Sequence, residues 1–198
     1  IVVGDISVDQ AIADTAATFG ALPPRPALPE LPAGPMRFPA APAEPVTLFH
    51  KGREDQAMGF IAWPTTGFSA ETRVLARTVS MLGSVFQLRL TDRLRESEGV
   101  SYSPSAGSAA SQVWPDYGYL AAQIEAPPGK LDAFFAAAQE IASDLASRPI
   151  SEDELNRARR PSLESLDRAR EGNAFWLNAL AEIGEDPFRL TSILTQRA

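Results

Sequence analysis

Proline is concentrated in one stretch of this chain, residues 21–45, which holds nine of its seventeen prolines. A proline has no backbone N–H to give to a helix or a sheet, and it favours an extended conformation for the residue before it. A central strand or a regular helix is therefore disfavoured there. We expect a connector that crosses the protein surface in extended form, so the folded elements must lie before and after it.

The residues before the connector predict a strand and a helix. Residues 1–3 are apolar and end at Gly4, which is typical of a short strand. Ser7 or Asp9 can cap the helix that follows, in which apolar residues recur at helical spacing. Gly20 stands where a glycine commonly ends a helix.

Two strands and a long helix are predicted after the connector. Residues 46–50 and 57–63 read as strands joined by a polar turn, and hence as a hairpin. From residue 69 to about residue 95 apolar side chains recur every three or four positions, which predicts a core-facing helix. Gly83, with the serine after it, could divide this run into two helices, and Gly99 should end it.

The remainder of the chain alternates again between strand and helix patterns. Residues 117–125 alternate between two faces, as in a half-buried strand. A helix starts at Ser151, where Glu154 has capping-box spacing, and Pro161 should end or kink that helix. The other expected segments are an extended stretch over 102–111, a turn at 127–129, an alanine-rich amphipathic helix over 131–145 and a helical end interrupted at 184–187.

Paired strands with helices between them predict an α+β fold, a two-layer sandwich with a mostly antiparallel sheet and helices packed on one face. The 198 residues, 44% of them hydrophobic, suffice for one domain with its own core. We therefore interpret 1–198 as a single domain, with the connector at 21–45 and a helical C-terminal tail at 161–198. Because the chain opens in a strand pattern without a methionine, we expect a piece excised from a longer protein.

Charge and hydropathy argue against two classes of partner. The net charge of −7 disfavours nucleic acid, because phosphate binding needs a concentrated basic face. The late arginines are interleaved with carboxylates, which is the pattern of a charge-paired helix face. No apolar run approaches the roughly 18 to 20 residues of a membrane span.

Metal chemistry is disfavoured by what the chain lacks. It has one histidine, His50, and no cysteine, whereas a catalytic zinc ion takes three protein ligands drawn largely from histidine, cysteine and carboxylates. His50 ends a predicted strand, and we interpret it as a surface or hydrogen-bonded residue. The absence of cysteine also excludes disulfides and a thiol nucleophile.

The strongest functional signal is the segment Arg95-Glu96-Ser97-Glu98-Gly99-Val100-Ser101-Tyr102. It places a permanent cation and a phenol seven residues apart, with a glycine between them. A guanidinium presents fixed donors to a carbonyl oxygen, and a tyrosine hydroxyl can stabilise the oxyanion of a tetrahedral intermediate. Taken alone, the two residues are explained more simply as a helix-end arginine and a tyrosine that starts a strand.

Three segments, in order and at natural spacing, resemble the non-zinc domain of the pitrilysin/insulinase zinc peptidases. They are Val2-Val3-Gly4-Asp5-Ile6 with the helix end Phe19-Gly20-Ala21-Leu22-Pro23, then Leu82-Gly83-Ser84 with Arg89-Leu90 and the run 94–103, and last Ile150-Ser151-Glu152-Asp153-Glu154-Leu155 with Ala158-Arg159. The tail, with Arg168-Ala169-Arg170-Glu171-Gly172-Asn173-Ala174-Phe175-Trp176, resembles large bacterial members of the secretory pathway.

The resemblance implies an enzyme of two halves around a closed chamber. One half carries an inverted His-x-x-Glu-His zinc motif, which is absent from this chain. The facing half carries an arginine and a tyrosine that donate to the peptide backbone near the scissile bond, and Arg95 and Tyr102 occupy those positions here. Zinc is thus expected in a partner domain or subunit, a peptide is the expected substrate, and the parent is expected in the periplasm or secreted from a Gram-negative bacterium.

Two functions of different classes stay open. In the first, the chain is the substrate-binding and transition-state-stabilising domain of a zinc endopeptidase, and is inactive when isolated. In the second, it is a non-catalytic scaffold or partner subunit of the same fold. The presence of both Arg95 and Tyr102 favours the first. The acidic residues at 151–154 need no function, because helix capping and the charge preference of a helix start explain them.

Overall fold

The computed structural model describes residues 1–27, 34, 36–98, 104–181, 183 and 186–197. The chain divides into two compact units. The larger is Pro35–Ser162, and the smaller combines Ile1–Gly34 with Leu163–Ala198. The sheet, the core and the predicted site segment belong to the larger unit.

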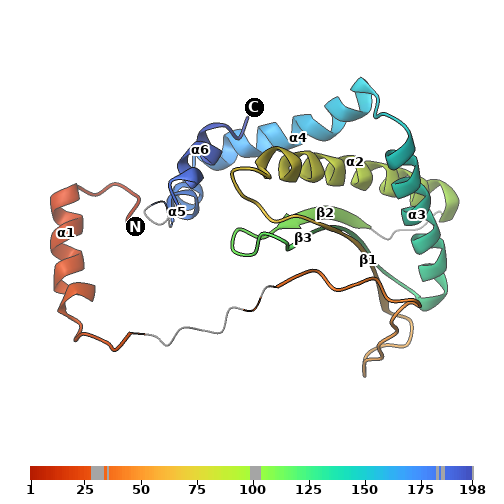
Figure 1. Cartoon of the computed structure of the whole chain (residues 1–198), viewed down its shortest axis with the longest axis horizontal. Helices are drawn as coiled ribbons and strands as arrows, with labels where there is room; N and C mark the ends of the chain where they lie inside the picture. Colours follow the sequence, from red (N-terminus) through yellow and green to blue (C-terminus); the bar gives the residue numbers. More distant parts are fainter. Residues whose placement is uncertain (28–33, 35, 99–103, 182, 184–185, 198) are drawn as a thin grey trace. The chain divides into compact units, whose positions relative to one another are not determined.

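The larger unit is built on a small antiparallel sheet, as predicted (Figure 1). Within the described residues its strands are β1 (Ala57–Thr65), β2 (Ser105–Ala110) and β3 (Gly118–Ala126), in the order β1-β3-β2. Gln123 of the central strand lies opposite Phe60 on one side and Ser105 on the other. β1 and β2 therefore form the two edges of this sheet.

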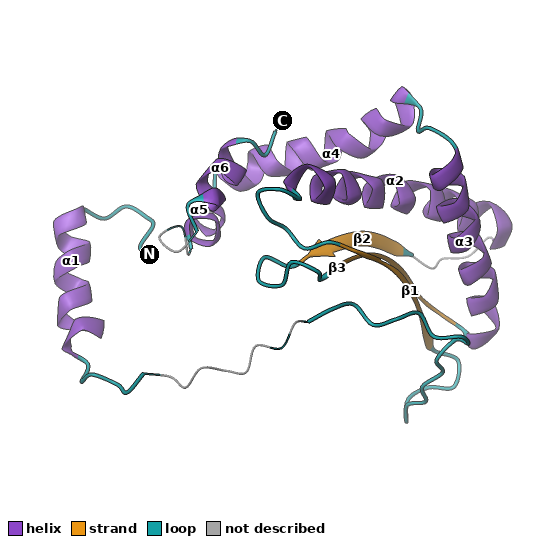
Figure 2. Ribbon diagram, viewed as in Figure 1, coloured by secondary structure: helices purple, strands orange, loops and turns teal. Residues whose placement is uncertain are grey.

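Two helices cover one face of the sheet, which confirms the α+β arrangement (Figure 2). They are α2 (Arg73–Glu98) and α3 (Leu131–Ser147). Every second residue of β3 points toward them and is buried, and the residues between point to the other face. The buried core of the unit consists of Phe86, Leu90, Leu94, Leu120, Ala122, Ile124, Ala126, Phe134, Ala137, Ala138 and Ile141.

The close approach of α2 to β2 depends on Gly83. A methyl group at Gly83 would lie 3.1 Å from the Cα of Gly107, so a side chain at this crossing would require the strand to shift by a few tenths of an ångström. The small side chains along β2 allow the helix to approach the strand closely. A division of the helix at Gly83 was one possibility, but α2 is continuous over 26 residues. Gly83 is instead a packing contact with β2.

The remaining elements are helical. The segment after β3 is a short 3-10 turn, η2 (Pro128–Lys130), as its Pro-Pro-Gly sequence predicts. The C-terminal helices are α4 (Glu152–Arg170), α5 (Asn173–Leu180) and α6 (Phe188–Leu194). Near the N-terminus, α1 (Val8–Ala17) is followed by the 3-10 turn η1 (Phe19–Ala21).

The start of α1 is capped as predicted, and its end is not. The Ser7 hydroxyl accepts a hydrogen bond from the Gln10 N–H at 3.2 Å. Gly20 lies inside η1, and Thr18 occupies the C-cap of the helix. No residue of α1 is buried, and Ile12 of its apolar stripe is 62% exposed.

From residue 22 on, the described part of the connector has no regular element, as the prolines predicted. Two side chains hold it on the larger unit. The ring of Phe38 lies 5.5 Å from that of Tyr119 and 6.3 Å from that of Tyr117, and Arg37 forms an ion pair with Asp116 at 3.5 Å. Arg37 and Phe38 therefore hold this part of the connector against the surface of the larger unit.

Two predicted strands are wrong. Residues 1–3 and 46–50 have no strand partner among the described residues and take no regular structure. Their apolar side chains are exposed, and that of Phe49 is 95% exposed. The predicted hairpin is therefore absent, because β1 pairs with β3 and not with the segment before it. An apolar pattern is not sufficient for a strand, which needs a neighbour for its backbone hydrogen bonds.

Pro161 was expected to end or kink α4. The helix does not end there but continues to Arg170, and the kink stays a prediction. Pro161 is exposed, so solvent can hydrate the carbonyl that loses its partner to the proline ring. The start of α4 follows the prediction. The Ser151 hydroxyl accepts a hydrogen bond from the Glu154 N–H at 3.3 Å.

Candidate functional site

Arg95 lies in the last turn of α2, where the sequence placed it. Its side chain is exposed, whereas Leu94 beside it is only 7% exposed and Leu90 is fully buried. One side of this turn is thus fixed in the core while the guanidinium faces solvent. A cation at the C-terminal end of a helix is also favoured by the partial negative charge of the last carbonyls.

Tyr102 lies outside the described residues, as does Gly99. The structure places the two ends of this segment. α2 is described through Glu98, and the chain is described again from Pro104, which is buried just before β2 begins. The part of the predicted extended stretch from 105 to 110 is a strand.

A glutamine that the sequence analysis did not single out connects α2 to the start of β2. The Gln87 Nε2 donates to the Pro104 carbonyl at 2.8 Å and to the Thr91 hydroxyl at 2.9 Å. Its Oε1 accepts from the Ala106 N–H at 2.5 Å. The signal in the sequence is a polar amide directly after Phe86, inside an otherwise apolar helical stripe.

A charged cluster joins three helices on another side of α2. The Arg89 guanidinium donates to both carboxylate oxygens of Glu154, at 2.5 and 2.8 Å, and to the Asp144 carboxylate at 2.6 Å. These hydrogen bonds lower the pKa of Glu154 and raise that of Arg89. The capping explanation of Glu154 was therefore incomplete, because its carboxylate also connects α4 to α2.

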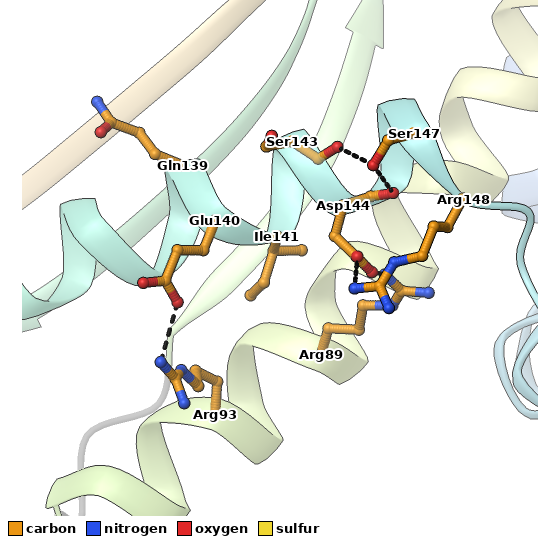
Figure 3. A pocket seen from close by; sticks show the side chains of 9 residues that line it. All are labelled: Arg89, Arg93, Gln139, Glu140, Ile141, Ser143, Asp144, Ser147 and Arg148. Carbon is orange, nitrogen blue, oxygen red and sulfur yellow. Dashed lines mark hydrogen bonds and ion pairs between the residues drawn. The ribbon is translucent and has the colours of Figure 1, made fainter.

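The same cluster borders a pocket of about 760 Å³ between α2 and α3 (Figure 3). Within it Arg93 pairs with Glu140 at 2.9 Å, and Arg148 pairs with Asp144. The cations that line the pocket face carboxylates of the protein itself. These ion pairs connect α2 to α3.

The single histidine is a surface residue. His50 is exposed, and its Nε2 lies 3.4 Å from the Gln56 carbonyl oxygen, as expected for a hydrogen-bonded surface histidine. Within the described ranges no three His, Cys, Asp or Glu side chains are gathered closely enough to hold a metal ion. In the same ranges, no helix is both long enough and apolar enough to cross a membrane.

The sequence model of one protein family, described as the peptidase M16 inactive domain, matches residues 1–161. Among curated proteins, the chloroplastic stromal processing peptidase of rice, Oryza sativa subsp. indica, is 29% identical over 106 residues, which cover 54% of this chain and 8% of that protein. The corresponding peptidase of Arabidopsis thaliana is 28% identical over the same length and the same shares. The chain thus spans less than a tenth of the length of these relatives.

Solved structures share the fold. The peptidase M16 inactive domain of Pseudomonas fluorescens superposes with a TM-score of 0.63 at 22% identity, and the match covers 98% of this chain and 44% of that one. The periplasmic protease PqqL of Escherichia coli superposes with a TM-score of 0.55 at 19% identity, over 98% of this chain and 22% of that one. At these identities the likeness concerns the fold.

Proposed function

The chain belongs to the family of the peptidase M16 inactive domain, and we propose that it serves a zinc endopeptidase as the domain that binds the peptide and stabilises the transition state of its hydrolysis. With one histidine and no cysteine, the chain offers a poor ligand set for catalytic zinc. The zinc ion belongs to a partner domain or subunit. The isolated chain is inactive.

The observation that carries this proposal is the position of Arg95. It is exposed at the end of α2, directly after Leu94, which is buried in the core. A group that contacts substrate works best on an element whose own position is fixed by packing. Seven residues later the sequence supplies Tyr102, the second donor that the family resemblance implies.

The two side chains have different tasks in this proposal. The Arg95 guanidinium presents several N–H donors and binds a backbone carbonyl of the substrate. The Tyr102 hydroxyl donates to the oxygen that becomes negative when the scissile carbonyl turns tetrahedral. A donor of the second kind contributes more in the transition state than in the bound substrate, so its loss lowers kcat more than it raises KM.

Steady-state kinetics of the full-length enzyme on a fluorogenic peptide test this assignment. Tyr102→Phe keeps the ring and removes the hydroxyl, and we expect kcat to fall on the order of 100- to 1000-fold. Arg95→Ala should raise KM as well. Tyr117→Phe is the matched control, because Tyr117 packs on Phe38 and is given no part in the reaction. If Tyr102→Phe retains the wild-type kcat, the scaffold function takes the place of the catalytic one.

The partner and the compartment are part of the same proposal. The partner is a domain or subunit that carries the zinc motif, and co-purification of a zinc-containing peptidase with the tagged chain tests it. The periplasm of a Gram-negative bacterium is the proposed location, supported by the resemblance of the tail and by the shared fold with a periplasmic protease. Recovery of the parent protein in the cytoplasmic fraction would contradict it.

A further inference from the structure

We propose that the face of the sheet opposite the helices binds a segment of the peptide substrate at Tyr119 and Asp116, here called the Tyr119 site, and that this site takes an aromatic side chain preceded by an arginine. The connector contains such a pair and occupies the site in this structure, with Phe38 on Tyr119 and Arg37 on Asp116. The inference rests on the proposed function, because it names the class of peptide that the domain binds.

One face of the sheet is left open by the helices. α2 and α3 contact the other face, where every second residue of β3 is buried. Tyr119 and Gln123 lie between those buried residues, so their side chains point to the open face. Phe60 of β1 lies opposite Gln123 and is 52% exposed. The open face thus carries aromatic side chains on two strands.

A segment of the connector already lies on the open face, on the side of the sheet away from α2 (Figure 2). The ring of Phe38 lies 5.5 Å from that of Tyr119, with 45° between the ring planes, a separation at which aromatic rings attract each other. Phe38 is half-buried, whereas Arg37 and Pro39 beside it are exposed. Pro39 favours an extended conformation for Phe38. The contact is therefore that of an extended peptide which buries one aromatic side chain.

The charges on and beside the open face favour a basic residue in the bound peptide. Glu125 is the one charged residue in the sequences of the three strands, and its side chain alternates with the buried ones. Asp116 stands shortly before β3, and its Oδ2 lies 3.5 Å from the Arg37 Nε. An exposed ion pair of this kind adds little affinity, but it discriminates against a carboxylate at the same position of the peptide.

The contact of the connector is of a kind that can exchange with a second peptide. It consists of a half-buried ring and an ion pair whose side chains are 72% and 63% exposed. Residues 39–56, all of them described, contain no helix or strand, so Phe38 is tethered to β1 by a chain without regular structure. Such a tether gives the bound side chain an effective concentration on the order of millimolar. The connector therefore competes with the substrate and lowers its apparent affinity.

Fluorescence anisotropy of the 198-residue chain tests the inference with a labelled peptide of sequence Met-Arg-Phe-Pro-Ala-Ala, which is that of residues 36–41. Phe38→Ala vacates the Tyr119 site, and we expect this variant to bind the probe about 3- to 10-fold more tightly than the wild type. Adding Tyr119→Leu should weaken the binding at least about 10-fold. Phe49→Ala is the matched control and should leave the affinity unchanged, because Phe49 is 95% exposed and lies outside the site.

Changes in the probe and at an exposed residue guard against a loss of structure in Tyr119→Leu. With Phe38→Ala as the host, a probe in which alanine replaces the phenylalanine should bind at least about 10-fold more weakly. A probe with glutamate in place of the arginine should bind about 3- to 10-fold more weakly, and Asp116→Lys should reverse this preference. Asp116 is 63% exposed, so its replacement leaves the core intact.

Steady-state kinetics of the full-length enzyme connect the Tyr119 site to the substrate. Two fluorogenic peptides are compared, one with an arginine–phenylalanine pair outside the scissile bond and one with two alanines at those positions. Tyr119→Leu should raise KM for the first peptide about 10-fold and leave kcat unchanged, because a contact that is equal in the bound substrate and the transition state affects KM alone. Phe38→Ala should lower this KM, and neither change should affect the second peptide.

The inference is overturned if Phe38→Ala and the wild type bind the probe equally, or if Tyr119→Leu leaves KM for the arginine–phenylalanine peptide unchanged. It is overturned as well if Phe38→Ala binds no probe and sedimentation shows a wild-type dimer that Phe38→Ala separates, because the occupant is then the connector of a second copy. The binding measurements need neither zinc nor Tyr102. If Tyr102→Phe retains the wild-type kcat, the proposed function fails, and anisotropy still decides whether the Tyr119 site binds a peptide.

Discussion

Arg89 and Glu154 form the best-shielded ion pair of the charged cluster. Their side chains are 21% and 14% exposed, and the two parallel hydrogen bonds fix α4 against α2. By contrast, Arg93 and Glu140 are 54% and 63% exposed, so solvent screens their attraction. Arg89 and Arg93, four residues apart on one helix, should thus contribute differently to the free energy of unfolding.

Replacing Arg89 by methionine should lower the free energy of unfolding by about 1–3 kcal/mol. The change leaves the half-buried Glu154 without its hydrogen-bonded cation, and a shielded charge that loses its partner is costly. Urea unfolding followed by circular dichroism measures the effect. Arg93→Met is the matched control and should stay within about 0.5 kcal/mol of the wild type. If both changes lowered the free energy of unfolding equally, the Arg89 pair would not be the more stabilising of the two.

The same pair predicts how stability depends on pH. Hydrogen bonding to Arg89 holds the pKa of Glu154 below its usual range, so the folded protein releases this proton more readily than the unfolded chain. The stabilising contribution is complete above the ordinary glutamate pKa of about 4.3, and it is lost as the pH falls through the lowered pKa of the folded state.

Comparing the wild type with Glu154→Gln between pH 7 and pH 3 checks this sign. The difference in the free energy of unfolding should be constant at neutral pH and should shrink on acidification, because protonation removes the carboxylate from the wild type as well. A difference that grows as the pH falls would show that Glu154 is stabilised in its protonated form, against the expected direction.

At the scale of elements, α2 approaches β2 closely where the two cross. A Cβ at Gly83 would lie 3.1 Å from the Gly107 Cα and 3.3 Å from the Leu120 Cδ1. Gly83→Leu should therefore push the strand away and destabilise the unit by about 1–3 kcal/mol. Thermal unfolding measures the loss. Ser80→Leu, at an exposed position of the same helix, should change stability by less than about 0.5 kcal/mol.

Elements with a strong local pattern were predictable from sequence. The helices of the larger unit and the strand β3 follow their apolar periodicity closely. The apolar side chains recur on one face of each element, and that face is the one that packs in the core. The failures share a physical cause. The strands expected at 1–3 and 46–50 required a partner strand, and the breaks expected at Gly83 and Pro161 ignored what surrounds those residues.

In α2 the apolar pattern of the sequence predicts the helix but not the burial of each of its residues. Its apolar stripe was expected to be core throughout, yet Val74 and Leu75 in the first turn are 69% and 50% exposed. A helix of 26 residues is about 39 Å long, whereas a strand of six residues spans about 20 Å. The helix is therefore longer than β2, so this strand cannot cover all of it.

The candidate site was predictable only in part. Arg95 could be placed from sequence because a helix pattern and a glycine bracket it. The contact of Gln87 with Pro104 and Ala106 could not, because it joins residues 17 and 19 positions apart and depends on how closely the helix approaches the strand. The roles of Arg95 and Tyr102 stay predictions until the variants are measured.

At the scale of the whole molecule, the prediction of one domain over 1–198 stays a prediction, and the division into two units suggests a test. All residues of the core cluster lie within Pro35–Ser162. A fragment of this unit should therefore unfold cooperatively in urea, with dispersed amide resonances. A fragment that ends at residue 150 loses Glu154 and should be less stable. An unfolded Pro35–Ser162 fragment would show that its core depends on the rest of the chain.

The isolated chain should retain no catalytic zinc and cleave no peptide. We expect this because the chain has one histidine and no cysteine, and so few side chains that could serve as zinc ligands. Metal analysis after dialysis and a fluorogenic peptide assay measure both properties. The full-length enzyme, assayed alongside, should cleave the peptide and lose this activity with a zinc chelator. Stoichiometric zinc in the isolated chain, or chelator-sensitive cleavage by it, would refute the expectation.

The division into units has a consequence for synthesis on the ribosome. The larger unit is continuous in sequence, and its last core residue, Ile141, is made well before the final helices. Domains generally fold as units while the chain is still being made. The larger unit can therefore bury its core without the smaller unit, whereas the smaller unit combines Ile1–Gly34 with Leu163–Ala198 and cannot form before the second of these segments has been made.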